Sequence, residues 1–337
     1  PTGPETSESY NWEVSTPEEQ GLDSQILADA FEEAGQRPFV RSILIVKNGY
    51  LVAEQYYRGF DRDDAHNVKS VSKSFLSALV GIALREQYLD SLGQKMLDFF
   101  PEYVTPDLDP RKYNITIRHL LMMRAGIDHE RNNYSQIYSS DNWIKTTIEL
   151  PLLFDPGEQF YYNTFQTHLL SAILTKATGM STLDFANRYL LEPSHISVKD
   201  WEQGPQGYYF GGNNMFFTPR DMARFGYLYL KGGVLDGEQI VPADWVVASV
   251  TDYTGNQDWT WGELRNINYG YLWWLGEMND YSMQLAIGYG GQFIILIPAL
   301  NMIIVTTCNS NTDWDTADAQ EQSVLELAAN HILPAIK

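Results

Sequence analysis

One segment constrains the fold more than any other: the run HNVKSVSKSFLSALVGIALRE, from His66 to Glu86. From about Ser70 onward its apolar residues occupy nearly every position around a helix, which predicts a helix buried on most sides. Lys73 lies inside this apolar run. Because a buried ammonium is costly unless a neighbouring group uses it, we expect Lys73 to have a function in the core.

Ser70 is the candidate partner of this lysine. Residues three apart on a helix share a face, so the Ser70 hydroxyl and the Lys73 amine can come within hydrogen-bond distance. A lysine whose charged form is disfavoured by burial can activate a serine nucleophile, and a helix N-terminus favours a developing oxyanion. A chain of this length contains roughly one Ser-x-x-Lys by chance, so the pair needs support from other motifs.

The order of the remaining segments predicts an α+β fold. Two β-type runs within Arg41–Tyr57 are joined by Asn48-Gly49, a strong hairpin signal. Helical, loop-rich patterns follow from about 91 to 233. Capped helices are expected at Thr116–Gly126, Thr167–Gly179 and Thr218–Gly233, then strands at Tyr269–Gly276, Tyr281–Gly288, Gln292–Pro298 and Asn301–Cys308, and a last helix at Ala319–Leu333. We expect one antiparallel sheet flanked by N- and C-terminal helices, with an inserted helical lobe.

Charge excludes several classes of partner. The chain has 23 Lys and Arg against 43 Asp and Glu, a formal net charge of −20. Such a surface repels nucleic acid and anionic membranes, and it favours either solubility in a salty habitat or an affinity for cationic substrates. The longest apolar runs are interrupted and rich in β-branched residues, which predicts buried strands and no membrane-spanning segment.

The remaining composition predicts neither a disulfide nor a metal site. Cys308 is the single cysteine, so no intrachain disulfide can form. The six histidines show no metal-ligand spacing, and we expect no metal and no cofactor. The polar leader PTGPETSES is typical of a trimmed mature N-terminus, which favours a secreted or periplasmic location over the cytoplasm.

With these motifs in order, the chain resembles the penicillin-binding protein and serine β-lactamase superfamily. SVSKSF is similar to the first motif of its class C branch, which also holds esterases, D-amino-acid peptidases and nylon-oligomer hydrolases. The resemblance spans about Ile43 to Ser310 and rests on these further segments: SLGQKMLDFFPEY, ITIRHLLMMRAG, PGEQFYYNTFQTHLLSAILTKATG, TPRDMARFGYLYLKGG and YGYLWW. It implies a single β-lactamase/transpeptidase-like catalytic domain over residues 1–337, with an α/β lobe at about 15–70 and 240–337 and a helical lobe at about 71–239.

The family's second motif, Tyr-x-Asn, has two candidates in FYYNTF. Tyr161 with Asn163 matches the letters, whereas Tyr162 matches the spacing from the flanking motifs. We choose Tyr162, because spacing is set by backbone geometry. Thr164 then occupies the asparagine position and offers a hydroxyl in place of an amide. The resemblance gives this tyrosine a share in moving the serine proton, and whether Lys73 or Tyr162 is the base stays open.

The third motif, Lys-Thr-Gly or His-x-Gly in the family, maps by order to Tyr289-Gly290-Gly291. The resemblance assigns the oxyanion-hole N–H groups to Ser70 and to Gln292, the residue after the motif. Tyr289 replaces a lysine that in antibiotic-processing members holds a substrate carboxylate. Neutral or weakly polar acyl substrates are therefore expected to fit better than β-lactams or peptides ending in D-alanine.

Aromatic and amide side chains complete the predicted site. The family's equivalents of Trp143 and of the stretch Tyr208–Phe217, which includes Asn213 and Asn214, approach the nucleophile. The sequence thus predicts a serine hydrolase that cleaves esters or amides of small molecules through an acyl-enzyme. The alternatives are a β-lactamase or D,D-peptidase and a catalytically silent sensor or binding module; the oligomeric state is left open.

Overall fold

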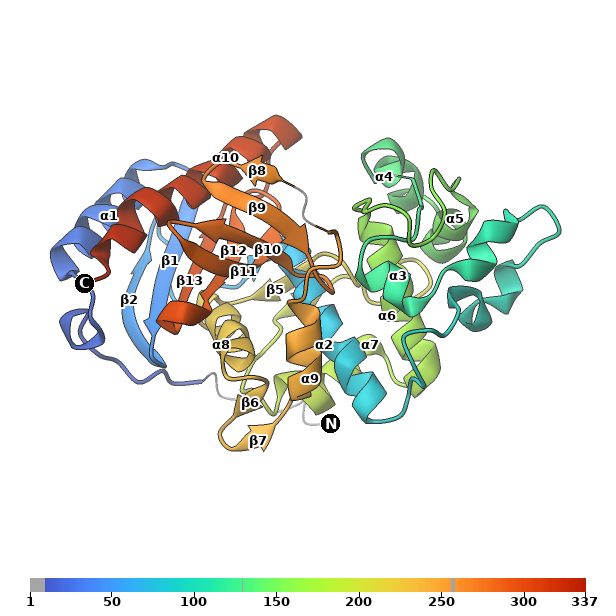
Figure 1. Cartoon of the computed structure of the whole chain (residues 1–337), viewed down its shortest axis with the longest axis horizontal. Helices are drawn as coiled ribbons and strands as arrows, with labels where there is room; N and C mark the ends of the chain where they lie inside the picture. The colour runs from blue at the N-terminus through green and yellow to red at the C-terminus, as the bar shows by residue number, and fades with distance from the viewer. Residues whose placement is uncertain (1–9, 129, 256–257) are drawn as a thin grey trace.

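The computed structural model describes residues 10–128, 130–255 and 258–337, and the polar leader, residues 1–9, lies outside the described residues. Its centre is an eight-stranded antiparallel sheet in the order β2-β1-β13-β12-β11-β10-β9-β8 (Figure 1). The strands are β1 Val40–Lys47, β2 Tyr50–Tyr56, β8 Trp259–Trp261, β9 Leu264–Tyr269, β10 Trp274–Met278, β11 Tyr281–Gly288, β12 Gln292–Ile297 and β13 Met302–Cys308. Because β1 pairs with β13, the first hairpin and the later strands share one sheet, as the sequence predicted.

The β1–β2 hairpin forms where the sequence predicts it. Asn48 and Gly49 both adopt positive φ, 54° and 89°, which the tight hairpin turn requires. The β1 register places Leu44 and Val46 on one face of the sheet and Ile43 and Ile45 on the other. All four side chains are buried, so both faces of the sheet are covered.

Helices cover the two faces unequally. On one face lie α1 (Ser24–Gln36) and α10 (Trp314–Leu327), which contact each other and enclose one of the two hydrophobic clusters. On the other face lies α8 (Pro219–Leu230), against β1, β12 and β13. Helix α8 also contacts α2, where the rings of Phe75 and Phe225 stack with their centroids 3.7 Å apart, so it packs between the sheet and α2.

The second hydrophobic cluster surrounds α2 (Ser72–Arg85), whose residues from Ser72 to Ala83 are all buried, as its apolar circumference predicts. The remaining helices are α3 Ile117–Leu121, α4 Glu130–Tyr138, α5 Trp143–Glu149, α6 Thr164–Thr178, α7 Thr182–Ala186 and α9 Ala243–Ser249. Figure 1 shows α2 between the sheet and helices α3–α7, and α9 contacts α2. Short strands complete the structure: β3 His66–Asn67, β4 Asp200–Trp201 and β5 Met215–Phe217 in one small sheet, and β6 Val234–Leu235 with β7 Glu238–Gln239 in another.

Several predicted elements have other bounds in the structure, among them the last helix, which begins at Trp314 and ends at Leu327 instead of spanning Ala319–Leu333. The helix expected over Thr116–Gly126 begins after its threonine cap but ends at Leu121. The strand expected over Tyr269–Gly276 is instead the end of β9, a turn and the start of β10, with Leu272 at a φ of 61°. The segments Thr116–Gly126 and Tyr269–Gly276 each have the periodicity of the predicted element, but the chain turns within each of them.

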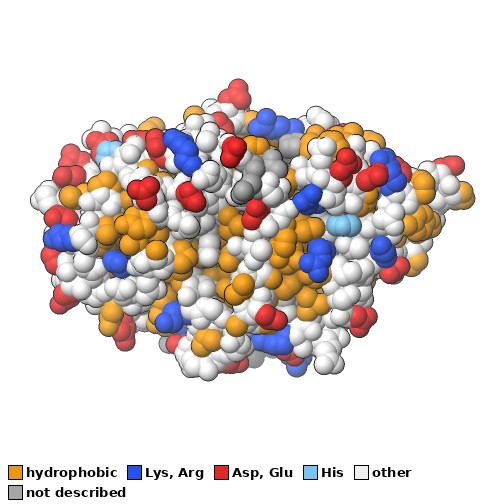
Figure 2. Space-filling view, in the orientation of Figure 1, with side chains coloured by type: hydrophobic (Ala, Val, Ile, Leu, Met, Phe, Trp, Pro, Cys, Tyr) orange, Lys and Arg blue, Asp and Glu red, His pale blue; other side chains and the backbone are white. Residues whose placement is uncertain are grey.

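The surface carries its charge diffusely. Figure 2 shows acidic and basic side chains scattered over one face, with hydrophobic side chains gathered near its middle. Among the described residues, no helix is long and apolar enough to cross a membrane.

Candidate active site

Ser70 lies in a tight turn at the start of α2. The 3₁₀ turn Lys69–Val71 leads into the helix, and Lys69 adopts a positive φ of 52°. The Asn67 side chain accepts the Lys69 N–H at 3.0 Å, and Val68 N–H donates to Met215 O at 2.9 Å. A left-handed conformation at a non-glycine residue is strained, and these bonds from the small sheet hold it. Ser70 is thereby fixed at the edge of a cavity.

Lys73 makes the contact that its burial required. Its Nζ lies 2.8 Å from Ser70 Oγ, 3.0 Å from Thr164 Oγ1 and 2.7 Å from Gly212 O, and the residue is 1% exposed. A carbonyl oxygen can only accept, so one amine hydrogen is directed to Gly212, and a second can go to Thr164. In the neutral amine this leaves the lone pair facing the serine. The geometry suits transfer of the Ser70 proton to Lys73.

The structure brings Tyr162, and not Tyr161, to this pair. Lys73 Nζ lies 4.9 Å from the centre of the Tyr162 ring, which stacks on Trp274 in the cavity wall. The Tyr161 ring packs against Phe154 instead. The spacing argument and the geometry therefore agree on Tyr162.

Asn163 and Thr164 have separate roles at the start of α6. Asn163 is buried and caps the helix: its Oδ1 accepts the N–H groups of Phe165 and Gln166. Its Nδ2 donates to Asp128 O, so its side chain serves the fold and does not reach the cavity. Thr164, by contrast, lines the cavity and contacts Lys73.

The strand that contacts the turn holding Ser70 ends just before the predicted third motif. Tyr289, Gly290 and Gly291 form the turn between β11 and β12, so the strand edge beside Ser70 is the end of β11. There a Cβ on Gly288 would lie 2.2 Å from Val68 O, so only glycine lets β11 approach the turn that holds Ser70, called the nucleophile turn below. Sequence order alone could not show which residue meets Val68.

Gln292 and Gly291 therefore do not reach the cavity. Gln292 pairs with Gly288 in the sheet, and its buried side chain bonds the backbone of Cys308 on β13. Gly291 packs against Cys308, where a Cβ would lie 2.9 Å from Sγ. Tyr289 does line the cavity, with its hydroxyl donating to Thr312 O at 2.9 Å. Among the described residues, no acceptor is bonded to the backbone N–H of Tyr289 or of Ser70.

The cavity beside Ser70 measures about 610 Å³. Asn213 lines it, whereas Trp143 is buried in an aromatic cluster with Phe165 and Phe210 and does not. Its apolar wall comes from the four sheet strands β8–β11, a wall that the sequence analysis missed: Trp259, Trp261, Leu264, Ile267, Trp274 and Ile287. The alternating apolar residues of β8 and β9 could have indicated two strands with one apolar face. Assigning that face to the cavity requires the order of strands in the sheet.

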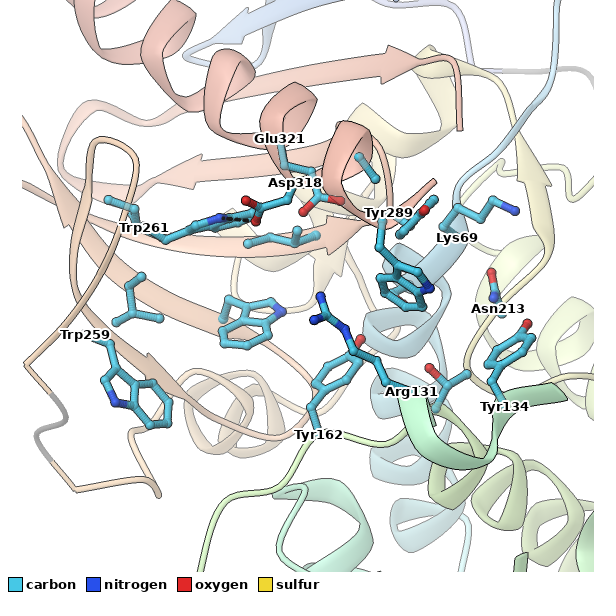
Figure 3. A pocket seen from close by; sticks show the side chains of 18 of the residues that line it. Lys69, Arg131, Tyr134, Tyr162, Asn213, Trp259, Trp261, Tyr289, Asp318 and Glu321 are labelled. Atoms are coloured by element: carbon cyan, nitrogen blue, oxygen red, sulfur yellow. Dashed lines mark hydrogen bonds between the residues drawn. The ribbon is translucent and has the colours of Figure 1, made fainter. Parts of the chain in front are cut away.

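Charged groups complete the lining, and they too were missed. Figure 3 shows Asp318 and Glu321 extending from α10 on one side, with Arg131 and Tyr162 on the other. Asp318 accepts the Trp261 indole N–H at 2.8 Å. Arg131 lies over the Trp314 ring, 4.9 Å from its centre. The lining thus joins side chains from α4 and α10, which are far apart in the sequence.

Glu321 has the most perturbed carboxyl group of this wall. Burial raises its pKa to about 7, against an opposing hydrogen bond from Gly290 N–H, and the charge of Asp318 adds to the rise. Burial also raises the pKa of the Tyr289 phenol. Perturbed carboxyl groups in a cavity are a common feature of functional sites.

The fold and the Ser70–Lys73 contact are now described, and comparison with known proteins gives the family. The β-lactamase family model matches residues 27–329, so the chain belongs to the β-lactamase family, whose members are generally serine hydrolases. Its relatives place it with the class C-like members.

Individual relatives are distant. The chain is 25% identical to a 6-aminohexanoate-dimer hydrolase of Paenarthrobacter ureafaciens, over 96% of this chain and 86% of the relative. Among solved structures, EstCE1, a hydrolase with promiscuous acyltransferase activity, superposes with a TM-score of 0.73 at 17% identity, covering 91% of this chain and 99% of its own. A D-stereospecific amidohydrolase from Streptomyces sp. gives 0.67 at 15% identity, covering 91% and 98%. At these identities the structures show a shared fold.

Proposed function

We propose that this protein is a hydrolase of small esters or amides that works through an acyl-enzyme on Ser70. The observation that carries the proposal is the 2.8 Å contact between Ser70 Oγ and the buried Lys73 Nζ, at the edge of a cavity large enough for a small organic substrate. The names of the relatives, a dimer hydrolase and an amidohydrolase, support amide or ester chemistry.

The first half-reaction forms the acyl-enzyme. Ser70 Oγ attacks the substrate carbonyl carbon while its proton passes to Lys73 or Tyr162, and the carbonyl π electrons move onto the oxygen. When the tetrahedral intermediate collapses, the stored proton goes to the leaving alcohol or amine. Water then repeats the sequence and releases the acid. Thr164 and Gly212 hold the amine in place throughout.

The oxyanion is assigned to the N–H groups of Ser70 and Tyr289, in place of the pair with Gln292 that the sequence indicated. Both N–H groups are without a bonded acceptor in the described part of the chain, and both residues line the cavity. Gly288 supports this arrangement because it lets the end of β11 approach the nucleophile turn. Preorganised donors of this kind stabilise the charge that develops in the transition state.

The wall formed by β8–β11 favours an acyl group with an apolar or aromatic chain. Tyr289 brings no positive charge to the third motif, and its hydroxyl hydrogen is engaged by Thr312. These features support neutral acyl substrates over β-lactams, so β-lactam or D-alanyl peptide turnover remains the alternative.

A substrate panel tests the proposal. We expect p-nitrophenyl butyrate to be hydrolysed faster than nitrocefin, and Ser70→Ala to abolish ester turnover while melting at the wild-type temperature. Nitrocefin turnover equal to the ester rates would contradict the substrate preference. Equal, background-level ester rates in the wild type and Ser70→Ala would instead indicate the silent binding module.

A further inference from the structure

The β11–β12 turn, residues 289–291, has to hold the Tyr289 N–H toward the cavity, yet its own backbone does little to fix it. Gly290 and Gly291 adopt φ values of +80° and +102°, a region open chiefly to glycine. Two successive glycines leave the unfolded turn many conformations. Contacts from outside the turn must therefore select the observed one.

Thr306 of β13 donates to Gly291 O at 2.8 Å, and the contacts to Gly290 come from two consecutive residues of α10. Glu321 Oε1 accepts the Gly290 N–H at 2.6 Å. With its side-chain nitrogen facing the turn, Gln320 donates to the carbonyl oxygens of Gly290 and Asn309, each at 3.0 Å. Both backbone polar groups of Gly290 are thus bonded to one helix, which itself packs on the sheet through a buried face.

We propose that Glu321 is a positioning residue: its carboxylate fixes the β11–β12 turn so that the neighbouring Tyr289 N–H stays directed at the substrate oxygen. This inference rests on the proposed function, because it assigns Glu321 a task in stabilising the oxyanion. Glu321 acts through the backbone and touches neither the nucleophile nor the proton carriers.

A carboxylate in this position could instead serve the substrate directly. Asp318 lies one helical turn earlier on α10 and lines the same cavity, so it provides a matched comparison. Its oxygens accept from the Trp261 indole and the Gln322 amide and make no bond to the turn. If negative charge in the cavity were what mattered, the two residues would behave alike. If the bond to Gly290 matters, only Glu321 affects the chemical step.

The test compares Glu321→Ala, Glu321→Gln and Asp318→Asn in p-nitrophenyl butyrate hydrolysis, with fluorophosphonate labelling of wild-type Ser70 as reference. We expect Glu321→Ala to lower kcat at least ~10-fold with KM changed less than about threefold, because losing an oxyanion donor costs up to ~10²–10³. Glu321→Gln should recover most of kcat, since an amide oxygen can accept the same N–H. Asp318→Asn should change KM more than kcat, the reverse of Glu321→Ala, because Asp318 lines the cavity but makes no bond to the turn.

Three results would overturn the positioning role alone: wild-type kcat in Glu321→Ala, an equal loss in Asp318→Asn, or no recovery in Glu321→Gln when all three variants melt within a few degrees of the wild type. A variant that melts much lower is to be assayed at a temperature where circular dichroism shows it folded, so that the comparison still decides. Failure of the wild-type protein to label at Ser70 would overturn the proposed function and this inference together.

Discussion

At the residue scale, the chemistry depends on two contacts of Lys73: its Nζ lies 2.8 Å from Ser70 Oγ and 4.9 Å from the centre of the Tyr162 ring. Helical spacing indicates the Ser70–Lys73 pair, because residues three apart share a face, but only the neighbouring motifs distinguish it from a chance match. The choice of Tyr162 over Tyr161 needed the spacing of neighbouring motifs. Asn163 could not be excluded from its letters, since capping a helix and binding a substrate use the same amide. Only its bonds to Phe165, Gln166 and Asp128 show that it caps α6.

Replacing Lys73 by methionine removes the amine that faces Ser70. We expect kcat/KM for ester hydrolysis to fall by about 10²–10⁴, the range for a general base. Lys112 offers a matched control, because it is equally buried and bonds a single carbonyl, Ile148 O, away from the cavity. Lys112→Met should lower stability but leave kcat/KM of the folded protein within about threefold. Equal losses in the two variants would show that burial, and not proton transfer, explains the effect.

Phenylalanine substitutions at the two adjacent tyrosines should have different effects on activity. Tyr162→Phe removes the hydroxyl group of the ring that lies beside Lys73. We expect kcat to fall at least ~10-fold, because this phenol is a candidate proton carrier. Tyr161→Phe changes a side chain that packs on Phe154, so its steady-state rates should stay near wild type. If stopped-flow ester assays show the larger loss in Tyr161→Phe, Tyr161 and not Tyr162 is the tyrosine of the second motif.

Among the elements, the approach of β11 to the turn before α2 shapes the site, because Gly288 lies against Val68. Local sequence shows glycines at 288, 290 and 291, but it does not show which of them meets Val68. That contact depends on how the sheet docks on the core around α2, and such tertiary information is absent from a local pattern.

Gly288→Ala tests this approach. Its new Cβ would lie 2.2 Å from Val68 O, which forces β11 and the nucleophile turn apart at a cost of about 1–3 kcal/mol. We expect a large loss of ester turnover and only a modest loss of unfolding free energy, which urea denaturation measures. Gly93→Ala is the control, because its nearest neighbour, Ser91 Oγ, would be 3.5 Å away. Full activity in Gly288→Ala would contradict the close approach.

The contact between α10 and the β11–β12 turn should also make stability depend on pH. Burial raises the Glu321 pKa from 4.5 to about 7; Asp318 adds to the rise, while Gly290 N–H and Arg131 oppose it, and Tyr289 and Cys308 lie nearby. A raised folded-state pKa contributes stability that is fully present below pH 4.5 and is lost as pH rises through 7.

Relative to Glu321→Gln, the wild type should therefore lose unfolding free energy between pH 5 and pH 8, by about 3 kcal/mol at most. Urea denaturation of both proteins at the two pH values measures the difference. A wild type that gains stability over this interval relative to the variant would show that Glu321 is ionised well below pH 7.

At the scale of the whole molecule, the fold class was predictable because the order of hairpin, helices and strands repeats a known arrangement. The sheet order and the family match confirm it. The cavity was not predictable, since its walls join α4, strands β8–β11 and α10, which meet only in the folded chain. The sequence could not show that α8 packs on both the sheet and α2, because its apolar face suits either neighbour.

The net charge of −20 should destabilise the compact state by self-repulsion. Screening that repulsion with salt should raise the melting temperature, because exposed charges farther apart than about 10 Å are largely screened at 0.1 M. Calorimetric scans at 10 mM and 500 mM NaCl test this. A melting temperature that falls with salt would indicate that exposed ion pairs outweigh the excess acidity.

If Ser70 is the nucleophile and Lys73 makes it reactive, a fluorophosphonate should trap Ser70 covalently at a rate that depends on Lys73. Peptide mass spectrometry of the labelled wild type should find the adduct on Ser70, and Lys73→Met should label at least ~100-fold more slowly. An adduct on any other residue, or equal labelling rates in the two proteins, would contradict the account.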